Sequence, residues 1–297
     1  MPSPELKALL ELRWANRYRP ELSIEELRGT GDDPGSEPRI GTQVESCDAN
    51  GVYGEWVELG TPTTGTVFMF LHGGGYYRSS AKASRRIASA LSQACGCRCF
   101  TVDYRLAPEH PFPAALEDAL SAYHWLKEQE GSARKIIVGG SSAGGGLTAA
   151  LLAKLKSLGE CQPAAAILLS PWTDLTQSAK TFETNAELDP TISKAYLDRF
   201  AKAYLSGEDP RHPFASPYYS ALGGFPPLLI QGGKSETMFG DAVAFAHKAR
   251  DAGVEVVFEA YDDVPHGWQN SDHVVLGIPE TLEAIDRISK FFRIHCI

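Results

Sequence analysis

The sequence lacks any apolar run long enough to cross a bilayer. Its longer apolar stretches, such as residues 164–169, fall far short of the ~20 residues that a membrane-spanning helix needs. It also lacks the apolar segment of a signal peptide, because Glu5, Lys7, Glu11 and Arg13 are spread through its first residues. We therefore expect no membrane span, no targeting signal and a cytoplasmic location.

Positive charge is scarce as well. The 28 Lys and Arg residues are outnumbered by 37 Asp and Glu residues, which leaves a formal net charge of -9. Proteins that bind the phosphates of nucleic acids need clustered Lys and Arg, so no nucleic-acid partner is expected. With 43% hydrophobic residues, the 297-residue chain is too apolar to be disordered and long enough for one large core or two ordinary domains.

The six cysteines lack the pairing of a metal site. Cys95, Cys97 and Cys99 stand at alternate positions, and the other three are isolated at Cys47, Cys161 and Cys296. A structural zinc site usually has a C-x2-C pair followed by a second pair or by histidines. The alternation suits a strand and its approach, with the thiols serving as small apolar side chains. We expect reduced cysteines, no metal and no disulfide framework.

Short apolar strands alternate with helices along most of the chain. The patterns predict strands over residues 66–71, 98–103, 135–138, 164–169, 227–231 and 254–260, and helices over 81–94, 112–127, 143–158, 240–252 and from residue 280 onward. Such alternation predicts an α/β fold with a mostly parallel sheet covered by helices on both faces. The turn Asn50-Gly51 predicts an antiparallel hairpin from residues 42–47 and 52–59.

Two segments stand outside this alternation. Residues 4–18 have helical spacing, and Ser23-Ile24-Glu25-Glu26 reads as the capping box of a second short helix. Residues 172–224 are too long for a plain connection and contain a helical pattern over 194–205. An insertion of this length above a sheet is more often a lid than a separate domain.

A serine-containing turn joins the strand at 135–138 to the helix that follows it. It reads Gly140-Ser141-Ser142-Ala143-Gly144, the Gly-x-Ser-x-Gly pattern of a nucleophile elbow, where only small neighbours fit around a strained serine. Ser142 fits the frame and is the predicted nucleophile, because the pattern centred on Ser141 would require a glycine where Ala143 stands. A glycine-rich turn of a nucleotide-binding fold is the competing interpretation.

A glycine-rich loop follows the strand at 66–71. In His72-Gly73-Gly74-Gly75 the glycines allow backbone N–H groups to approach a substrate oxygen. We predict that the N–H groups of Gly74, Gly75 and Ala143 form an oxyanion hole, and that His72 and Gly73 support the loop.

A general base and a carboxylate are expected after the last two strands. His266 lies in a loop after the strand at 254–260, a context that the other seven histidines lack. Glu236 follows the strand at 227–231 and completes the chain order of serine, acid and histidine. Asp241 remains an alternative acid, although it falls inside the next predicted helix.

The combined motifs resemble the hormone-sensitive-lipase family of α/β-hydrolases. The resemblance rests on the loop at 72–75, the segment YRLAPEHPFPAA at 104–115, the elbow and the segment SPWTDL at 170–175, and extends from about Gly60 to the C-terminus. The chain departs from the family pattern where Ser141 replaces the usual Asp of the elbow. This replacement is expected to weaken the polar support of the loop at 72–75. The chain departs again where Glu236-Thr237-Met238 replaces Asp-Pro-Leu. The segment at 104–115 is expected to brace the loop at 72–75 without acting in catalysis.

The resemblance implies a serine carboxylesterase that hydrolyses short-acyl-chain esters without a cofactor or metal. It implies a single α/β-hydrolase domain over 1–297, with a cap made from residues 1–33 and 172–224 and a catalytic core made from residues 40–171 and 225–297. It also implies a homodimer formed through the strand at 254–260. The residues Trp14, Tyr18 and Phe214 are candidates to line the substrate pocket. The alternatives are an amidase or lactonase that uses the same site, and a ligand-binding receptor with the hydrolase fold.

Overall fold

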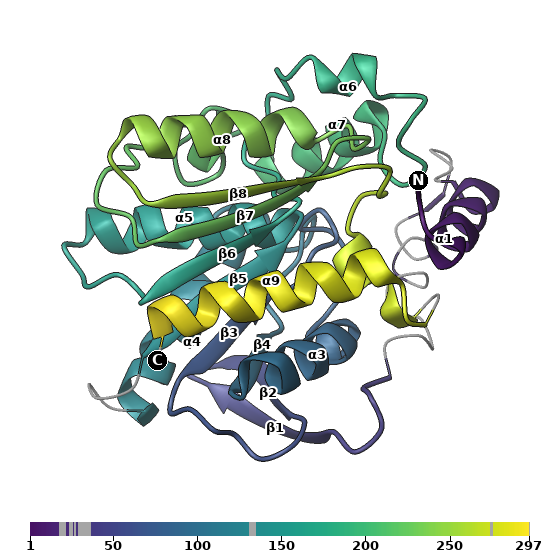
Figure 1. The fold of residues 1–297 in the computed structure, drawn as a ribbon. Coiled ribbons are helices and arrows are strands. Elements are labelled where there is room, and N and C mark those ends of the chain that lie inside the picture. The colour runs from purple at the N-terminus through teal and green to yellow at the C-terminus, as the bar shows by residue number, and fades with distance from the viewer. Residues whose placement is uncertain are drawn as a thin grey trace.

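The computed structural model describes residues 1–17, 22, 23, 26, 28, 37–130, 135–273 and 276–296. Within these residues an eight-stranded sheet has the strand order β1-β2-β4-β3-β5-β6-β7-β8 (Figure 1). Its strands are β1 (Gln43–Ala49), β2 (Val52–Glu58), β3 (Val67–Leu71), β4 (Arg98–Val102), β5 (Ile136–Ser141), β6 (Ala165–Leu169), β7 (Leu228–Gly233) and β8 (Val256–Tyr261). The β1–β2 and β2–β4 pairs are antiparallel and the other pairs are parallel. The predicted mostly parallel sheet with an antiparallel hairpin at one edge is confirmed.

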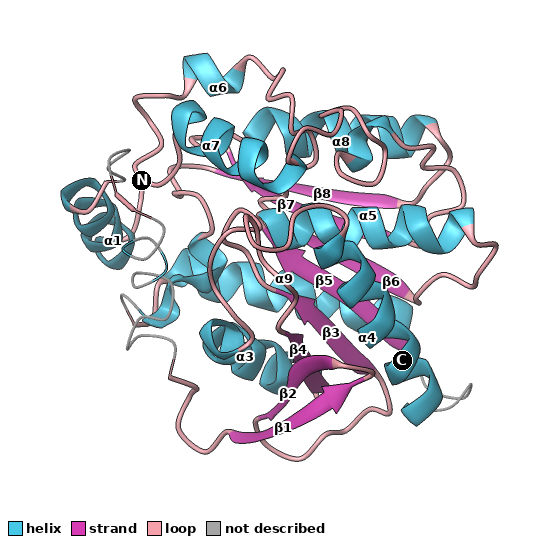
Figure 2. Ribbon diagram, turned by 180° about the vertical axis from the view of Figure 1, so that it is seen from behind, coloured by secondary structure: helices cyan, strands magenta, loops and turns pink. Residues whose placement is uncertain are grey.

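Helices cover both faces of this sheet. The α-helices are α1 (Pro4–Ala15), α3 (Arg85–Cys95), α4 (Ala114–Glu130), α5 (Ala143–Ser157), α6 (Thr181–Thr184), α7 (Lys194–Leu205), α8 (Phe239–Asp251) and α9 (Pro279–Cys296). Among the described residues, 3-10 helices are η2 (Lys82–Ser84), η3 (Pro217–Tyr219) and η4 (Trp268–His273). Helices α3 and α9 lie on one face, and α4, α5 and α8 lie on the other (Figure 2).

The alternation of side chains along β3 explains why its sequence is apolar throughout. Phe68 and Phe70 join the core formed with α3 and α9. The intervening residues Val67, Met69 and Leu71 join the core formed with α4 and α5. A strand covered on both faces needs apolar residues at every position, which is why no polar alternation marks it.

Two of the predicted helices begin later than expected. The helix predicted over 81–94 starts as the 3-10 turn η2 and becomes α-helical only at Arg85. The helix predicted over 112–127 begins at Ala114. The hairpin turn agrees with the prediction, because Asn50 and Gly51 have φ values of 57° and 84°, the left-handed pair that a two-residue type I′ turn requires.

The three alternating cysteines pack as small apolar side chains. Cys95 is the last residue of α3, Cys97 lies between α3 and β4, and Cys99 lies in β4, so only the last belongs to a strand. All three are buried in the core with α3 and α9. Every cysteine is a free thiol, and the described part of the chain contains no group of His, Cys, Asp or Glu that could hold a metal ion.

The two segments predicted to form a cap differ in their contacts. Helix α1 packs through Leu6 and Leu9 against Val264 and Trp268, which flank His266. Helices α6 and α7 belong to the insertion between β6 and β7 (Figure 1). The capping-box hydrogen bonds between Ser23 and Glu26 are present, at 2.7 and 3.2 Å, while most of the helix predicted there lies outside the described residues.

None of the described helices is both long and apolar enough to span a membrane.

Candidate active site

Ser142 occupies a strained turn between β5 and α5. Its backbone has φ 57° and ψ −120°, in a region that residues other than glycine rarely adopt. The turn is held by hydrogen bonds from Ser142 N–H to Leu169 O at 2.8 Å, and from the N–H groups of Gly146 and Trp172 to Ser142 O, each at 3.0 Å. The predicted strand–turn–helix context of a nucleophile elbow is therefore present.

The two glycines of the elbow are required by close backbone contacts. A Cβ atom on Gly140 would lie 2.4 Å from the carbonyl oxygen of Gly144. One on Gly144 would lie 2.0 Å from the carbonyl oxygen of Leu71, at the end of the neighbouring strand β3. These contacts are shorter than van der Waals separations, so neither position accepts a larger residue without a backbone shift.

The glycine-rich loop runs beside the elbow. A Cβ atom on Gly73 would lie 3.4 Å from the Cβ of Ser142, which places the loop next to the serine. Gly74 and Gly75 have φ values of 104° and 67°. The carbonyl of Gly74 accepts hydrogen bonds from the N–H groups of Tyr77 and Arg78 at 3.1 Å, and these close the loop into a turn.

The segment at 104–115 braces this loop, as predicted. The ring of Tyr104 stacks on that of His72 with a centroid distance of 4.0 Å, and its hydroxyl donates to the carbonyl oxygen of His72 at 2.7 Å. The N–H of Ala107 donates to Tyr76 O at 2.8 Å. Nδ1 of His72 lies 2.7 Å from the carbonyl oxygen of Gly73. His72 is therefore held inside the loop by stacking and hydrogen bonding.

His266 and Glu236 form a buried hydrogen-bonded pair. Nδ1 of His266 lies 2.7 Å from Oε2 of Glu236, and the two residues are 6% and 1% exposed. The other oxygen, Oε1, accepts hydrogen bonds from Gly233 N–H at 2.6 Å and from the Ser170 hydroxyl at 2.8 Å. Burial raises the pKa of the Glu236 carboxyl, although its contacts with His266 and Ser170 act in the opposite direction.

Asp241 does not contact His266. It lies in the first turn of α8, where its Oδ2 accepts a hydrogen bond from Asp174 N–H at 3.2 Å. Burial and the neighbouring Asp174 carboxylate hold the pKa of Asp241 well above its usual range. Of the two candidate acids, the structure brings Glu236 to the histidine and directs Asp241 toward the SPWTDL segment.

Ser170 supports Glu236 and was not singled out from the sequence. It follows β6 with φ 45° and begins the SPWTDL segment. Its N–H donates to Gln231 O at 2.7 Å, and its hydroxyl reaches Glu236 Oε1. The resemblance marked this segment, but its contact with the acid depends on the packing of β6 beside β7.

Ser141, in place of the usual Asp, has a partner on the histidine loop. Its hydroxyl accepts a hydrogen bond from the Asn270 side chain at 2.8 Å. Asn270 lies in η4, four residues after His266. The substitution therefore links the elbow to the loop that carries the histidine.

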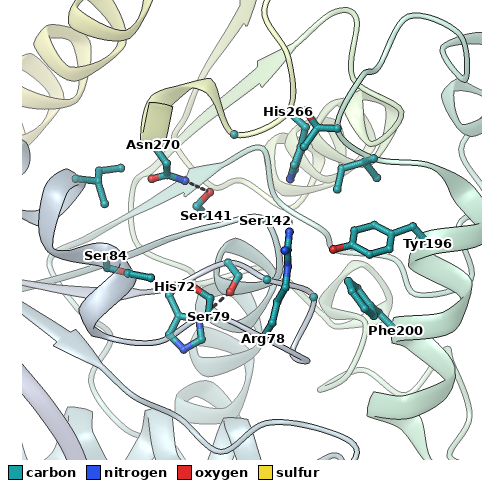
Figure 3. Close-up of a pocket in the computed structure, with 18 of the residues that line it drawn as sticks. His72, Arg78, Ser79, Ser84, Ser141, Ser142, Tyr196, Phe200, His266 and Asn270 are labelled. Atoms are coloured by element: carbon teal, nitrogen blue, oxygen red, sulfur yellow. Dashed lines mark hydrogen bonds between the residues drawn. The ribbon is translucent and has the colours of Figure 1, made fainter. Parts of the chain in front are cut away.

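Ser142 and His266 face one cavity of about 240 Å³ (Figure 3). One wall is the loop at 72–75, and another is the segment from Thr191 to α7, with Ile192, Tyr196, Leu197 and Phe200. A Cβ atom on Gly75 would lie 2.1 Å from the ring of Phe200, so the glycine lets α7 pack directly on the loop.

The prediction that Trp14 and Phe214 line this cavity is wrong, since neither is among its lining residues. Tyr18, the third candidate, lies outside the described residues.

Comparison with known proteins gives consistent matches. Residues 68–270 match a family model described as the alpha/beta hydrolase fold. The chain is 38% identical to an acetyl-hydrolase of Streptomyces hygroscopicus, over 99% of this chain and 97% of that protein. It is 32% identical to an esterase of Acinetobacter venetianus, over 84% of this chain and 81% of that one. The structure is similar to that of an esterase from the bacterial hormone-sensitive lipase family, with a TM-score of 0.95, 39% identity and full coverage of both chains.

Proposed function

Because the chain belongs to the hormone-sensitive-lipase family of α/β-hydrolases and is a carboxylic ester hydrolase, we propose that it hydrolyses short-acyl-chain esters through an acyl-enzyme on Ser142. The observation that carries the proposal is that a strained serine and a buried His266–Glu236 pair face one small cavity. A cavity of about 240 Å³ walled by Ile192, Tyr196 and Phe200 suits a short acyl chain.

The proposed reaction starts with attack of the Ser142 hydroxyl on the acyl carbon. His266 takes the serine proton on Nε2, while Glu236 holds the Nδ1–H tautomer and stabilises the imidazolium that forms. The negative charge on the carbonyl oxygen is stabilised by the N–H groups of Gly74, Gly75 and Ala143. Donors of this kind are worth about 3–4 kcal/mol each.

The second half of the reaction repeats these steps with water. His266 gives its proton to the departing alcohol, which leaves the acyl group on Ser142. Water then attacks the acyl carbon with His266 as the base, and the acid is released as the serine regains its proton. Besides the ester and water, these steps use only residues of the protein.

Replacement of Ser142 by alanine tests the proposal. We expect Ser142→Ala to abolish turnover of p-nitrophenyl butyrate in a protein with the same thermal unfolding as the wild type. A fluorophosphonate should label the wild type stoichiometrically at Ser142. Undiminished turnover in Ser142→Ala would overturn the mechanism, and absence of labelling in a folded wild type would favour a ligand-binding receptor. Assays of the matching anilide and lactone would detect an amidase or lactonase.

The cap, the dimer and the location stay predictions. The cap function of residues 172–224 is supported by the wall that α7 provides to the cavity. The homodimer would use β8, which is the last strand of the sheet, and the location predicted from the sequence is cytoplasmic.

A further inference from the structure

The three proposed oxyanion donors lie on two different segments. The N–H groups of Gly74 and Gly75 belong to the loop at 72–75, whereas that of Ala143 belongs to the first turn of α5. Donors stabilise a developing negative charge only where they converge on one oxygen, so contacts between the two segments must set their spacing.

Tyr76, the residue after these glycines, rests against the first turn of α5. Its side chain is only 1% exposed. A Cβ atom on Gly146, the fourth residue of α5, would lie 3.0 Å from the Tyr76 hydroxyl oxygen. The position of Tyr76 therefore bears on the distance between the loop at 72–75 and the turn that carries Ala143.

The backbone of Tyr76 has a conformation that needs support from its surroundings. Its φ is 60°, in the left-handed region that residues other than glycine occupy at a cost. Such a conformation persists only where the surrounding structure holds it. The carbonyl oxygen of Tyr76 accepts a hydrogen bond from Ala107 N–H at 2.8 Å. Its ring stacks on that of Tyr204, on α7, with a centroid distance of 3.9 Å and an interplanar angle of 8°.

Tyr204 is held firmly and lies away from the cavity. It is 1% exposed, and its carbonyl oxygen accepts a hydrogen bond from Phe112 N–H at 2.7 Å. The ring of Phe112 meets the Tyr204 ring edge-on at a centroid distance of 5.8 Å. Among the described residues that line the cavity, neither Tyr76 nor Tyr204 is present. An effect of Tyr204 on the reaction must therefore pass through Tyr76.

We propose that Tyr204 is a positioning residue for the oxyanion hole. Its stack on Tyr76 keeps the N–H groups of Gly74 and Gly75 directed at the same point as that of Ala143. This inference rests on the proposed esterase mechanism and gives α7 a second function besides its contribution to the cavity wall. Phe200, one turn earlier on α7, also packs on the loop at 72–75 but lines the cavity, so Tyr204 is the residue that separates positioning from substrate contact.

The variant Tyr204→Leu tests the inference, because leucine keeps an apolar side chain and removes the ring. With p-nitrophenyl butyrate we expect kcat to fall by about tenfold or more and KM to stay within about threefold of the wild type, since the donors act on the transition state. The acidic limb of the pH–rate profile should stay in place, because His266 and Glu236 are untouched.

Inhibition by butylboronic acid gives a second measurement on the same donors. Its boron takes up the Ser142 oxygen and becomes a tetrahedral anion that resembles the transition state, while His266 takes the serine proton. The inhibition constant should therefore rise in Tyr204→Leu by a factor similar to the fall in kcat/KM.

The matched variants separate the stack from other effects. Tyr204→Phe keeps the ring and removes a hydroxyl that has no hydrogen-bond partner among the described residues, so kcat should stay within about twofold of the wild type. Phe245→Leu removes a fully buried ring from α8, in the core formed with β7, and should lower stability in urea with little change in kcat. If Tyr204→Leu does not fold, Tyr204→Met provides the same measurements, because methionine fills irregular core space without a ring.

Several results would overturn the inference. One is a folded Tyr204→Leu with the kcat and the butylboronic acid inhibition constant of the wild type, even if KM rises, because α7 would then act only as a wall. A second is an equal loss in Tyr204→Phe, which would assign the effect to the hydroxyl. A third is an equal loss of kcat in Phe245→Leu, which would indicate general instability.

These results are distinguishable from failure of the esterase proposal. If the wild type hydrolyses p-nitrophenyl butyrate, and Ser142→Ala does not, the esterase proposal stands whatever Tyr204→Leu does. If the folded wild type neither hydrolyses this ester nor reacts with a fluorophosphonate, both proposals fail together.

Discussion

The carboxylate of Asp189 is hydrogen-bonded to Thr237, the residue that follows Glu236. Its Oδ2 accepts from the N–H and the hydroxyl of Thr237 at 2.9 and 3.2 Å. Its Oδ1 accepts from the N–H groups of Thr191 and Ile192, which line the cavity, at 2.9 and 3.1 Å. One fully buried carboxylate thus joins a wall of the cavity to the turn that carries Glu236.

Asn185 adds a second link of the same kind. Its side-chain amide donates to the carbonyl oxygens of Lys234 and Glu236 at 2.8 and 2.9 Å. Both Asn185 and Asp189 belong to the insertion between β6 and β7. The geometry of the insertion and the position of Glu236 are therefore coupled through buried polar contacts.

We expect Asp189→Asn to lower both activity and stability. An asparagine side chain has one acceptor oxygen and would direct its amide N–H groups at backbone N–H donors, at a cost of about 1–3 kcal/mol. The negative charge of Asp189 raises the pKa of Glu236, so its removal should lower that pKa. Glu236 would then stay ionised, and keep supporting His266, down to a lower pH. We therefore expect the acidic limb of the kcat/KM profile to shift to lower pH.

The measurements are a pH–rate profile and urea unfolding. The matched control is Asp198→Asn, which removes an exposed carboxylate that pairs with Lys194 on α7 in the same insertion. An acidic limb that stays in place, while stability falls, would show that Asp189 acts on folding alone.

We expect Ser170→Ala to shift the acidic limb the other way. The Ser170 hydroxyl holds the pKa of Glu236 down, so its loss should raise that pKa and move the limb to higher pH. Loss of one hydrogen bond to a charged group costs about 1.5–3 kcal/mol. At pH values below the acidic limb, a loss of this size corresponds to a kcat/KM that is at least tenfold lower than that of the wild type.

The control for this variant is Ser220→Ala, because the hydroxyl of that buried serine donates only to Pro217 O within its own turn. A profile of Ser170→Ala that overlays the wild type would refute the supporting role of Ser170.

We expect Glu236→Gln to lower kcat by about 10³–10⁴-fold, as replacement of a triad carboxylate by an amide does elsewhere. The amide cannot hold the required tautomer of His266 through the 2.7 Å contact. Asp241→Asn should keep kcat within a few-fold of the wild type, because Asp241 contacts Asp174 and not the histidine. Initial rates with p-nitrophenyl butyrate decide the matter, and the reverse pattern would make Asp241 the acid.

We expect Gly144→Ala to lower the free energy of unfolding by about 1–3 kcal/mol or more and to abolish activity. Its new Cβ would lie 2.0 Å from Leu71 O and 2.4 Å from His72 O, so the elbow and the loop at 72–75 must move apart. Gly223→Ala is the control, since its Cβ would lie 3.4 Å from a single neighbour, Ala252 O. Urea unfolding should distinguish the two, and equal stability of both variants would contradict the steric argument.

Local patterns in the sequence are sufficient to predict most elements and the elbow. The turn at Asn50-Gly51 and the Gly-x-Ser-x-Gly spacing around Ser142 depend on backbone conformations that only certain residues adopt, so they can be read over a few positions. The starts of α3 and α4 were misplaced because residues 82–84 form a 3-10 turn and residues 112 and 113 precede the helix, and neither feature changes the apolar periodicity.

By itself, the sequence determined the α/β class and predicted Ser142, Glu236 and His266 as the site residues, with an oxyanion hole at the glycines of residues 73–75. Only the tertiary structure decided that Glu236 and not Asp241 meets the histidine, and that Ser170 and Asp189 hold the turn around it. It also decided that Arg78, beside the loop at 72–75, lies close to the ring of Tyr196 on α7. These pairs are separated by 30 or more positions, and no local propensity encodes which of many buried polar groups will meet. Strand order and helix packing make that selection, because each buried polar group must find a partner within the folded core.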